Sequence, residues 1–348
     1  MKFRSWMNVL IFILLCLAIF FGRHQIVQAW GLLGKVDLRI FLFIIPLQFF
    51  SYYAVGEVMF SYLRSKGNLK TMSRWRMTRI ALELNFVNHI IPVPSIAGFS
   101  YLGWVLNRYD VSAGRATMAQ MIRYVMMFVS FIILIVISIV ALLFDQKLVD
   151  RTVVIISLAF ILAAIVCTAL LIYFVGNRKR LVILSNWFTK TVNNITSKIT
   201  RGKKRHILNQ HKVEVFFIEL HEDYLEIRKD KKILIRPLLW AITGNLLDVS
   251  MIYVAFLSLG YFANPATLII AYGVSSFAAI FAATPGGSGV YEAIMIAFLV
   301  SAGVPAGVAI AGTLLARVTL FAGTIIFGYL FYQLTINKYG KVKNSSDI

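Results

Sequence analysis

The clearest chemistry in this sequence lies around Glu292 and Arg317, two ionisable residues inside apolar segments. Glu292 ends the run Ala283-Thr284-Pro285-Gly286-Gly287-Ser288-Gly289-Val290-Tyr291-Glu292, in which a proline and three glycines interrupt an apolar stretch. Broken helix at membrane depth is tolerated only where it is buried in protein or lines a wet cavity. Ionisable side chains there are costly and mark functional sites. The run therefore predicts a binding or transport site, with Glu292 and Arg317 interacting directly or through a bound headgroup.

The backbone of this run has a chemistry of its own. A half-helix that begins at Ser288 and Gly289 presents free N–H groups and a partial positive charge, which suits an anion. Glycines at 286, 287 and 289 permit positive φ and close approach of a ligand. Two plainer interpretations stay open. The run is a packing kink or a turn between two short spans, or Glu292 and Arg317 form a buried ion pair that only sets helix register.

A second polar group precedes a proline break in the first half of the chain. Asn85, Asn88 and His89 are spaced i, i+3 and i+4, so they share one helix face that leads to Pro92. His89 either titrates near neutral pH and contacts a phosphate, or hydrogen-bonds a carbonyl that the prolines leave free. The predicted substrate-binding set is Asn85, Asn88, His89, Pro285, Gly286, Gly287, Ser288, Gly289, Glu292 and Arg317. No catalytic residue, metal ligand or cofactor is predicted.

Three further polar pairs lie on apolar segments: Asp248 with Asn245, Glu57 with Tyr53, and Arg123 with Gln120. For these, a structural role or an extension of the side chain to the interface is the favoured interpretation. Arg123 in particular lies near the inner end of its span.

The composition indicates a polytopic membrane protein. Hydrophobic residues make up 59% of the chain, charged residues 14%, and the mean hydropathy is +0.78. A net charge of +20 would suggest nucleic acid in a soluble protein, but the basic residues fall between apolar segments and so set topology. No nucleic-acid partner is predicted. Cys16 and Cys167 both lie in apolar runs, which leaves no disulfide framework.

About six transmembrane helices are expected from segments of roughly 20 apolar residues. Five are clear, and a shorter, uncleaved first helix over Trp6–Phe21 makes the sixth. Basic loops place the termini and residues 177–236 in the cytoplasm. The five clear segments are Ile40–Leu63, Thr117–Phe144, Thr152–Val175, Pro237–Leu259 and Gly307–Leu334.

Two apolar regions do not fit as simple spans. Counting crossings requires Ile80–Leu106 to enter and leave from inside, with its break at Pro92 and Pro94. It likewise requires Ala266–Ala302 to dip in from outside, with its break at Pro285-Gly286-Gly287. The predicted fold is therefore an all-α polytopic membrane protein with two oppositely oriented re-entrant broken-helix hairpins, an inverted arrangement seen in many transporters.

We treat residues 1–348 as one membrane domain, within which the basic cytoplasmic loop 177–236 contains an amphipathic helix. Its apolar residues recur at helical spacing, so the helix lies on the inner leaflet or packs on a neighbour. The basic run Arg201–Arg205 just before it would attract anionic lipid. The apolar residues are Val213, Phe216, Phe217, Leu220, Tyr224 and Ile227.

The run Pro285–Glu292, followed by Gly303 and Leu314-Leu315-Ala316-Arg317, resembles the signature of the lysylphosphatidylglycerol synthase transmembrane region, also called the flippase-like domain. Leu84–Pro92 and Gly98–Leu102 are similar to the first hairpin of that family, although Val93-Pro94-Ser95 departs from its glycine-rich step. The resemblance implies a bacterial cytoplasmic membrane protein that moves aminoacylated or other anionic lipids between leaflets. It also implies a homodimer.

Two functions of different classes follow. The first is a stand-alone translocase for a phospholipid or a lipid-linked sugar, which handles an anionic or aminoacylated headgroup between the two hairpins. The second is the membrane subunit of a lipid-modifying aminoacyl or glycosyl transferase, with a cytosolic transferase partner. Since only Asn337–Ile348 follow the last span, a synthase domain is not expected here. Small-solute transport is a third alternative and would need a hydrophilic cavity. The sequence contains no P-loop, H-E-x-x-H or G-x-S-x-G motif.

Overall fold

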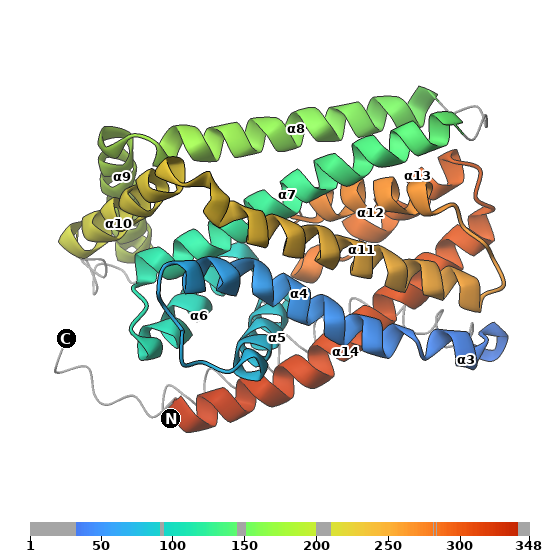
Figure 1. Ribbon diagram of the computed structural model, residues 1–348, viewed down its shortest axis with the longest axis horizontal. Coiled ribbons are helices and arrows are strands. Elements are labelled where there is room, and N and C mark those ends of the chain that lie inside the picture. The colour runs from blue at the N-terminus through green and yellow to red at the C-terminus, as the bar shows by residue number, and fades with distance from the viewer. Residues whose placement is uncertain are drawn as a thin grey trace.

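Every regular element in the described part of this chain is a helix, as expected of a chain that must satisfy its backbone hydrogen bonds in lipid. The computed structural model describes residues 33–90, 94–144, 151–199, 210–280, 282 and 284–339. The longer helices are α4 (Ile44–Ser65), α5 (Arg74–Ile90), α6 (Pro94–Leu106), α7 (Ala113–Phe144), α8 (Arg151–Val175), α9 (Arg178–Ile199), α10 (Gln210–Lys229), α11 (Ile235–Ser258), α12 (Pro265–Ile280), α13 (Val290–Ser301) and α14 (Ala306–Tyr339). Figure 1 shows α4, α7, α8, α11 and α14 running lengthwise through the bundle.

Among the described residues, five helices are long and apolar enough to cross a membrane, and they coincide with the five clear segments predicted from the sequence. Their candidate spans are Leu38–Ser65, Ala113–Leu142, Val154–Val175, Lys231–Ser258 and Ala306–Lys338. The first of these includes the short helix α3 (Leu38–Phe41), and the fourth includes the 3-10 turn η3 (Lys231–Leu234). The predicted first helix, Trp6–Phe21, lies outside the described residues. The chain is therefore a multi-pass membrane protein.

The two irregular regions form two helix pairs. In the first pair, α5 is described as far as Ile90 and α6 begins at Pro94. The residues between them, which include the expected break at Pro92, lie outside the described part of the chain. In the second pair, α12 ends at Ile280 and α13 begins at Val290, with a 3-10 turn, η4 (Pro285–Gly287), between them. Neither helix of the second pair is long enough to span a bilayer alone.

The helix pairs lie toward opposite ends of the bundle. The pair α5/α6 connects the end of α4 to the start of α7, and both of these ends contact α10. The pair α12/α13 connects the end of α11 to the start of α14, at the other end of the bundle (Figure 1). The turn η4 packs against α5, so the end of α5 near His89 meets the turn of the second pair inside the bundle.

Two groups of buried apolar side chains correspond to these two ends. One surrounds α4, α5, α6 and the start of α7, with Phe60, Tyr62 and Phe86 fully buried. The other joins the second half of α7 to α11, α12 and α13, around Phe256 and Leu268. By contrast α8 leaves much of its apolar surface exposed, at residues such as Leu158 and Leu162, as a lipid-facing helix does.

The basic segment 177–236 contains two long helices rather than the single amphipathic helix predicted. The additional helix, α9 (Arg178–Ile199), leaves Ile183 and Trp187 exposed. The predicted helix is α10, and its apolar face packs on the neighbouring helices through Leu220, Phe216 and Tyr224. Of the two placements considered for this helix, the structure thus has the one against protein. The basic run Arg201–Arg205 lies outside the described residues.

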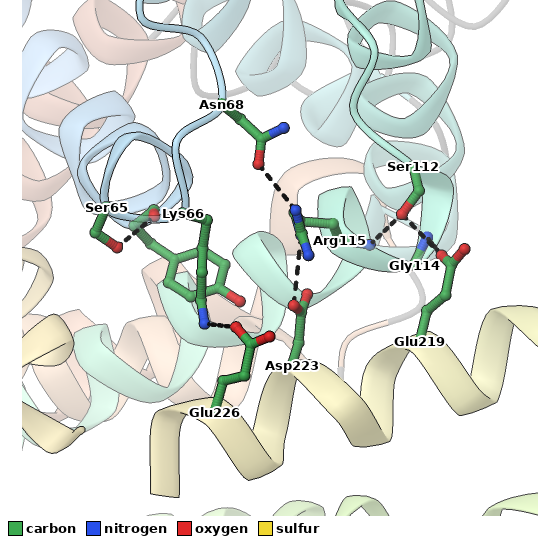
Figure 2. A network of polar contacts seen from close by, with 10 residues as sticks. Ser65, Lys66, Asn68, Ser112, Gly114, Arg115, Glu219, Asp223 and Glu226 are labelled. Atoms are coloured by element: carbon green, nitrogen blue, oxygen red, sulfur yellow. Dashed lines mark hydrogen bonds and ion pairs between the residues drawn. The ribbon is translucent and has the colours of Figure 1, made fainter. Parts of the chain in front are cut away.

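Acidic residues on α10 hold it against the ends of α4 and α7, as Figure 2 shows. Glu226 pairs with Lys66, and the Lys66 ammonium lowers the pKa of this glutamate. Asp223 lies 3.4 Å from the Nε of Arg115, and burial raises the pKa of that aspartate. Glu219 accepts hydrogen bonds from the Ser112 hydroxyl at 2.8 Å and the Gly114 N–H at 3.1 Å. The carboxylate of Glu219 therefore caps the positive N-terminal end of α7.

Glu219→Gln should weaken the docking of α10, because it removes a negative charge from that helix end. We expect a loss of about 0.5–1 kcal/mol, typical of a charge at a helix terminus. Amide hydrogen exchange in α10 should then be about two- to fivefold faster. Glu222→Gln, at an exposed position on the same helix, is the matched control. Equal exchange in the two variants would contradict the anchoring role of Glu219.

Candidate functional site

The two ionisable residues singled out in the sequence are in direct contact. Arg317, on α14, donates from Nε to Oε1 of Glu292 at 2.8 Å. It also donates from Nη2 to the carbonyl of Gly286, and its guanidinium stacks on the rings of Tyr291 and Phe321 at 4.3 and 4.5 Å. Arg317 thus ties the glycine turn and the following half-helix to the last span.

The second oxygen of Glu292 serves the helix on which it lies. Oε2 accepts the N–H of Gly289 at 2.6 Å, so Glu292 caps the N-terminus of α13. The Gly289 N–H, which the sequence predicted would bind an anion, is therefore hydrogen-bonded to the carboxylate of Glu292 instead. The Gly287 N–H is likewise bonded to the carbonyl of Thr284. Ser288 is half-buried, and its carbonyl accepts a hydrogen bond from the hydroxyl of Thr284 at 2.8 Å.

Positive φ angles at 286, 287 and 289 explain why this turn is built from glycine. Their φ values are 61°, 71° and 89°. A Cβ on Gly286 would lie 2.8 Å from Phe321 and 3.0 Å from His89, and a Cβ on Gly287 would lie 2.4 Å from the Cβ of Ala279. Gly289 has open space around it. Two of the three glycines are therefore needed for close packing as well as for backbone conformation. Pro285 is the first residue of the turn.

The polar face predicted on α5 is divided between two environments. Asn85 and His89 line a cavity at the centre of the bundle. His89 Nδ1 lies 2.8 Å from the carbonyl of Asn85, so Nδ1 carries the proton, and the ring stands edge-on to Phe321. Asn88 instead faces α6, where a Cβ on Gly98 would lie 2.2 Å from its Oδ1. The structure brings Asn85 and His89 toward the cavity and leaves Asn88 in a helix contact.

The central cavity has a volume of about 280 Å³ and lies where α5 and the turn between α12 and α13 meet α4, α7, α11 and α14. This is near the lower end of the roughly 300–1,000 Å³ typical of ligand sites. Its wall is mixed. Charged and polar side chains on one part are Asn85, His89, Arg123, Asp248 and Arg317, whereas Phe128, Phe131, Phe277 and Leu320 form an apolar part.

Arg123 is the least compensated charge in this cavity. Its side chain is buried, with 8% of the residue exposed. The guanidinium stacks on Tyr124 at 4.8 Å. Within the described ranges no carboxylate pairs with it, and its buried Nε has no hydrogen-bond partner. Of the two interpretations given for Arg123, a structural role or extension to the interface, its burial does not fit the second. A buried guanidinium beside a cavity, without a counter-ion, is the chemistry of an anion site.

Sequence reasoning missed several residues that line the cavity. Gln48 donates to the Tyr52 hydroxyl at 2.8 Å, and that hydroxyl lies 2.5 Å from Thr324, which joins α4 to α14. Ser51 and Tyr272 both donate to Asp248. The signal that could have found them is the recurrence of hydroxyl and amide side chains on one face of α4, at positions 48, 51 and 52.

The other predicted pairs have different partners in the structure. Asn245 donates to Ser130 on α7 at 3.0 Å rather than to Asp248. Glu57 pairs with Arg64 near the end of α4, and Tyr53 accepts from Arg74. The sequence groups these residues because they are close together along the chain. In the structure each polar group instead contacts a residue on another helix or farther along the same helix.

Comparison with known proteins identifies the family of this chain. A family model described as "Lysylphosphatidylglycerol synthase TM region" matches residues 6–328, which is most of the chain. No curated protein and no solved structure matches the chain. The match includes both helix pairs, the glycine turn and Arg317. The chain belongs to the family of the lysylphosphatidylglycerol synthase transmembrane region.

Proposed function

We propose that this protein moves a lipid with an anionic headgroup between the leaflets of the bacterial cytoplasmic membrane, and that the headgroup occupies the central cavity. Membership of the family supports a role in lipid modification or translocation. The observation that carries the proposal is Arg123, a buried guanidinium that lines the cavity and has no counter-ion in the described part of the chain. A phosphodiester would supply the missing charge and accept charge-assisted hydrogen bonds.

The position of the cavity supports translocation. It lies where two helix pairs from opposite ends of the bundle meet, near the middle of α11 and α14. In the proposed arrangement both pairs are re-entrant, with α10 and both termini on the cytosolic side. Transporters with inverted halves place their substrate sites at such a midplane. Movement of either pair, α5/α6 or α12/α13, would therefore change access to a headgroup bound there.

The size and wall of the cavity favour a lipid over a hydrated solute. A volume of about 280 Å³ accommodates a phosphate with a small alcohol, whereas the acyl chains must stay outside among the helices. The apolar part of the wall, at Phe128, Phe131 and Phe277, suits the glycerol end of such a molecule. Arg317 lines the same cavity but is already held by Glu292 and Gly286, so we assign anion binding first to Arg123.

The test is a headgroup-accessibility assay in vesicles that contain the purified protein and a trace of fluorescent phosphatidylglycerol. We expect wild-type protein to expose inner-leaflet probe to an external quencher. We expect Arg123→Gln to slow this by about tenfold or more, because an ionic hydrogen bond worth about 1.5–3 kcal/mol is lost. Arg178→Gln, at an exposed position on α9, is the matched control.

Two results would contradict the proposal. Wild-type vesicles that expose no more probe than protein-free vesicles would exclude translocation of this lipid. Equal rates for Arg123→Gln and Arg178→Gln would exclude the anion site. A zwitterionic fluorescent phosphatidylcholine, measured in parallel, reports whether the cavity selects a net negative headgroup.

A further inference from the structure

Asp248 is a half-buried carboxylate that the anion site does not use. It lies near the middle of α11 and is the only acidic residue among the described residues that line the central cavity. No lysine, arginine or histidine in the described ranges forms an ion pair with it. A carboxylate in the middle of a membrane span is costly when charged, and such residues mark ion or proton pathways.

Three helices build the surroundings of Asp248. Ser51 on α4 donates its hydroxyl to Oδ1, and Tyr272 on α12 donates its hydroxyl to Oδ2 at 2.6 Å. Each carboxylate oxygen thus accepts one hydrogen bond from a hydroxyl, and either oxygen can still be protonated. The two donors lie on elements that are distant in sequence, so the arrangement depends on the packing of α4, α11 and α12.

Other charged and titratable groups also face the cavity. The guanidiniums of Arg123 and Arg317 carry the positive charge, but Arg317 is compensated by Glu292. His89 is the other titratable base in the cavity, and its Nδ1 proton is held by the carbonyl of Asn85. Besides Asp248, the described titratable or charged residues that line the cavity are Tyr52 on α4, His89 on α5, Arg123 and Tyr124 on α7, Tyr272 on α12, Tyr291 on α13 and Arg317 on α14.

We propose that Asp248 takes up one proton when an anionic headgroup enters the cavity, so that the lipid and a proton are bound together. This inference rests on the proposed function, because it assigns the coupling ion of the same site. A headgroup phosphate brings a negative charge into a low-dielectric space that already holds the Asp248 carboxylate. Repulsion between the two favours the neutral carboxyl, and by linkage a neutral carboxyl favours the phosphate.

The proton balance is simple. A proton from water adds to the Asp248 carboxylate to give the neutral acid, and no other bond forms or breaks. A proton is favoured over a metal cation by the ligands present. Hard cations take about six oxygen ligands, whereas the described residues offer Asp248 only the hydroxyls of Ser51 and Tyr272. Both of those hydroxyls already donate to the carboxylate.

The test measures proton uptake during binding. The purified full chain in detergent is titrated with dihexanoyl-phosphatidylglycerol, by calorimetry in two buffers of different ionisation enthalpy and at several pH values. We expect wild-type binding to take up as much as one proton at the optimal pH. Asp248→Asn should still bind the lipid but take up less than a tenth as much. Glu222→Gln, at an exposed position on α10 away from the cavity, should keep the uptake.

A second pair of variants keeps the test decisive if Asp248→Asn does not fold. Ser51→Ala and Tyr272→Phe each remove one donor that stabilises the charged carboxylate. Each should therefore shift the midpoint of the pH dependence of uptake upward by about one pH unit. An unchanged midpoint in both variants would overturn the assignment to Asp248.

The remaining outcomes separate this inference from the proposed function. Wild-type binding without proton uptake overturns the coupling and leaves lipid binding intact. Uptake that persists in Asp248→Asn assigns the proton elsewhere and overturns the inference. Binding that changes with sodium at constant pH does the same in favour of a metal cation. Coupled binding with no lipid movement in vesicles supports the proton site but contradicts translocation.

Discussion

Glu292→Ala is expected to lower the free energy of unfolding by about 3–5 kcal/mol, the cost of leaving one member of a buried ion pair without its partner. Both carboxylate oxygens of Glu292 are engaged, one by Arg317 and one by the Gly289 N–H. The substitution would therefore leave a buried guanidinium uncompensated and the start of α13 uncapped. Thermal unfolding of the purified protein in detergent measures this loss.

Two matched variants separate the contributions to this effect. Glu292→Gln keeps an acceptor for the Gly289 N–H but removes the charge, so its loss should be smaller than that of Glu292→Ala. Glu222→Ala removes an exposed glutamate from α10 and should change stability by less than about 0.5 kcal/mol. If Glu292→Ala and Glu222→Ala unfolded alike, the pair would have no structural role.

Gly287→Ala should have the second large effect, because this position combines a left-handed backbone with close packing. Its φ is 71°, and an added Cβ would lie 2.4 Å from the Cβ and 2.9 Å from the Cα of Ala279. Backbone strain costs about 1–2 kcal/mol for a residue with a Cβ. Crowding against the α12 backbone should add about 1–3 kcal/mol, since a main-chain neighbour cannot move aside cheaply.

Gly289→Ala is the matched control for this prediction. Its φ of 89° is also positive, but no atom would lie within 4 Å of the added Cβ. It should therefore show only the backbone strain. Thermal unfolding of the two variants, measured side by side, gives the crowding term as a difference. Equal losses would mean that the turn moves away from α12 without cost. A larger loss in Gly289→Ala would contradict the packing described here.

The stability of the turn bears on the cavity as well as on the fold. The Gly286 carbonyl accepts from Arg317, and Gly286 packs against His89 and Phe321, all three of which line the cavity. Displacement of Gly287 would therefore move one wall of the proposed headgroup site. We accordingly expect variants of this turn to lose lipid movement together with stability, whereas Arg123→Gln should lose movement alone.

The spans, the break at the glycine turn and the family were predictable from the sequence because their causes are local. Apolar length predicts a span, and proline with glycine predicts an interruption, whatever the neighbouring helices do. The contact between Glu292 and Arg317 was predictable for a related reason. Two charges inside apolar segments have few stable arrangements, and pairing is the least costly of them.

The assignment of donors and acceptors was not predictable in the same way. The glycine turn was expected to offer its N–H groups to a ligand, but Glu292 takes one of them from a position one turn away. Asn88 was expected on the same helix face as His89, but its side chain lies against Gly98 on α6. Such choices depend on distances of a few ångström between elements, which spacing in the sequence does not contain.

The sequence alone determined where this chain can cross a membrane, where its helices must break and which charges need partners. Only the tertiary structure decided that Arg123 and Asp248 share a cavity with His89. It also decided that the carboxylate of Glu292 caps α13 as well as pairing with Arg317. The physical reason is that hydrophobic transfer and helix breaking accumulate along the chain residue by residue. The face that each helix turns toward the cavity is set by how all the helices pack together.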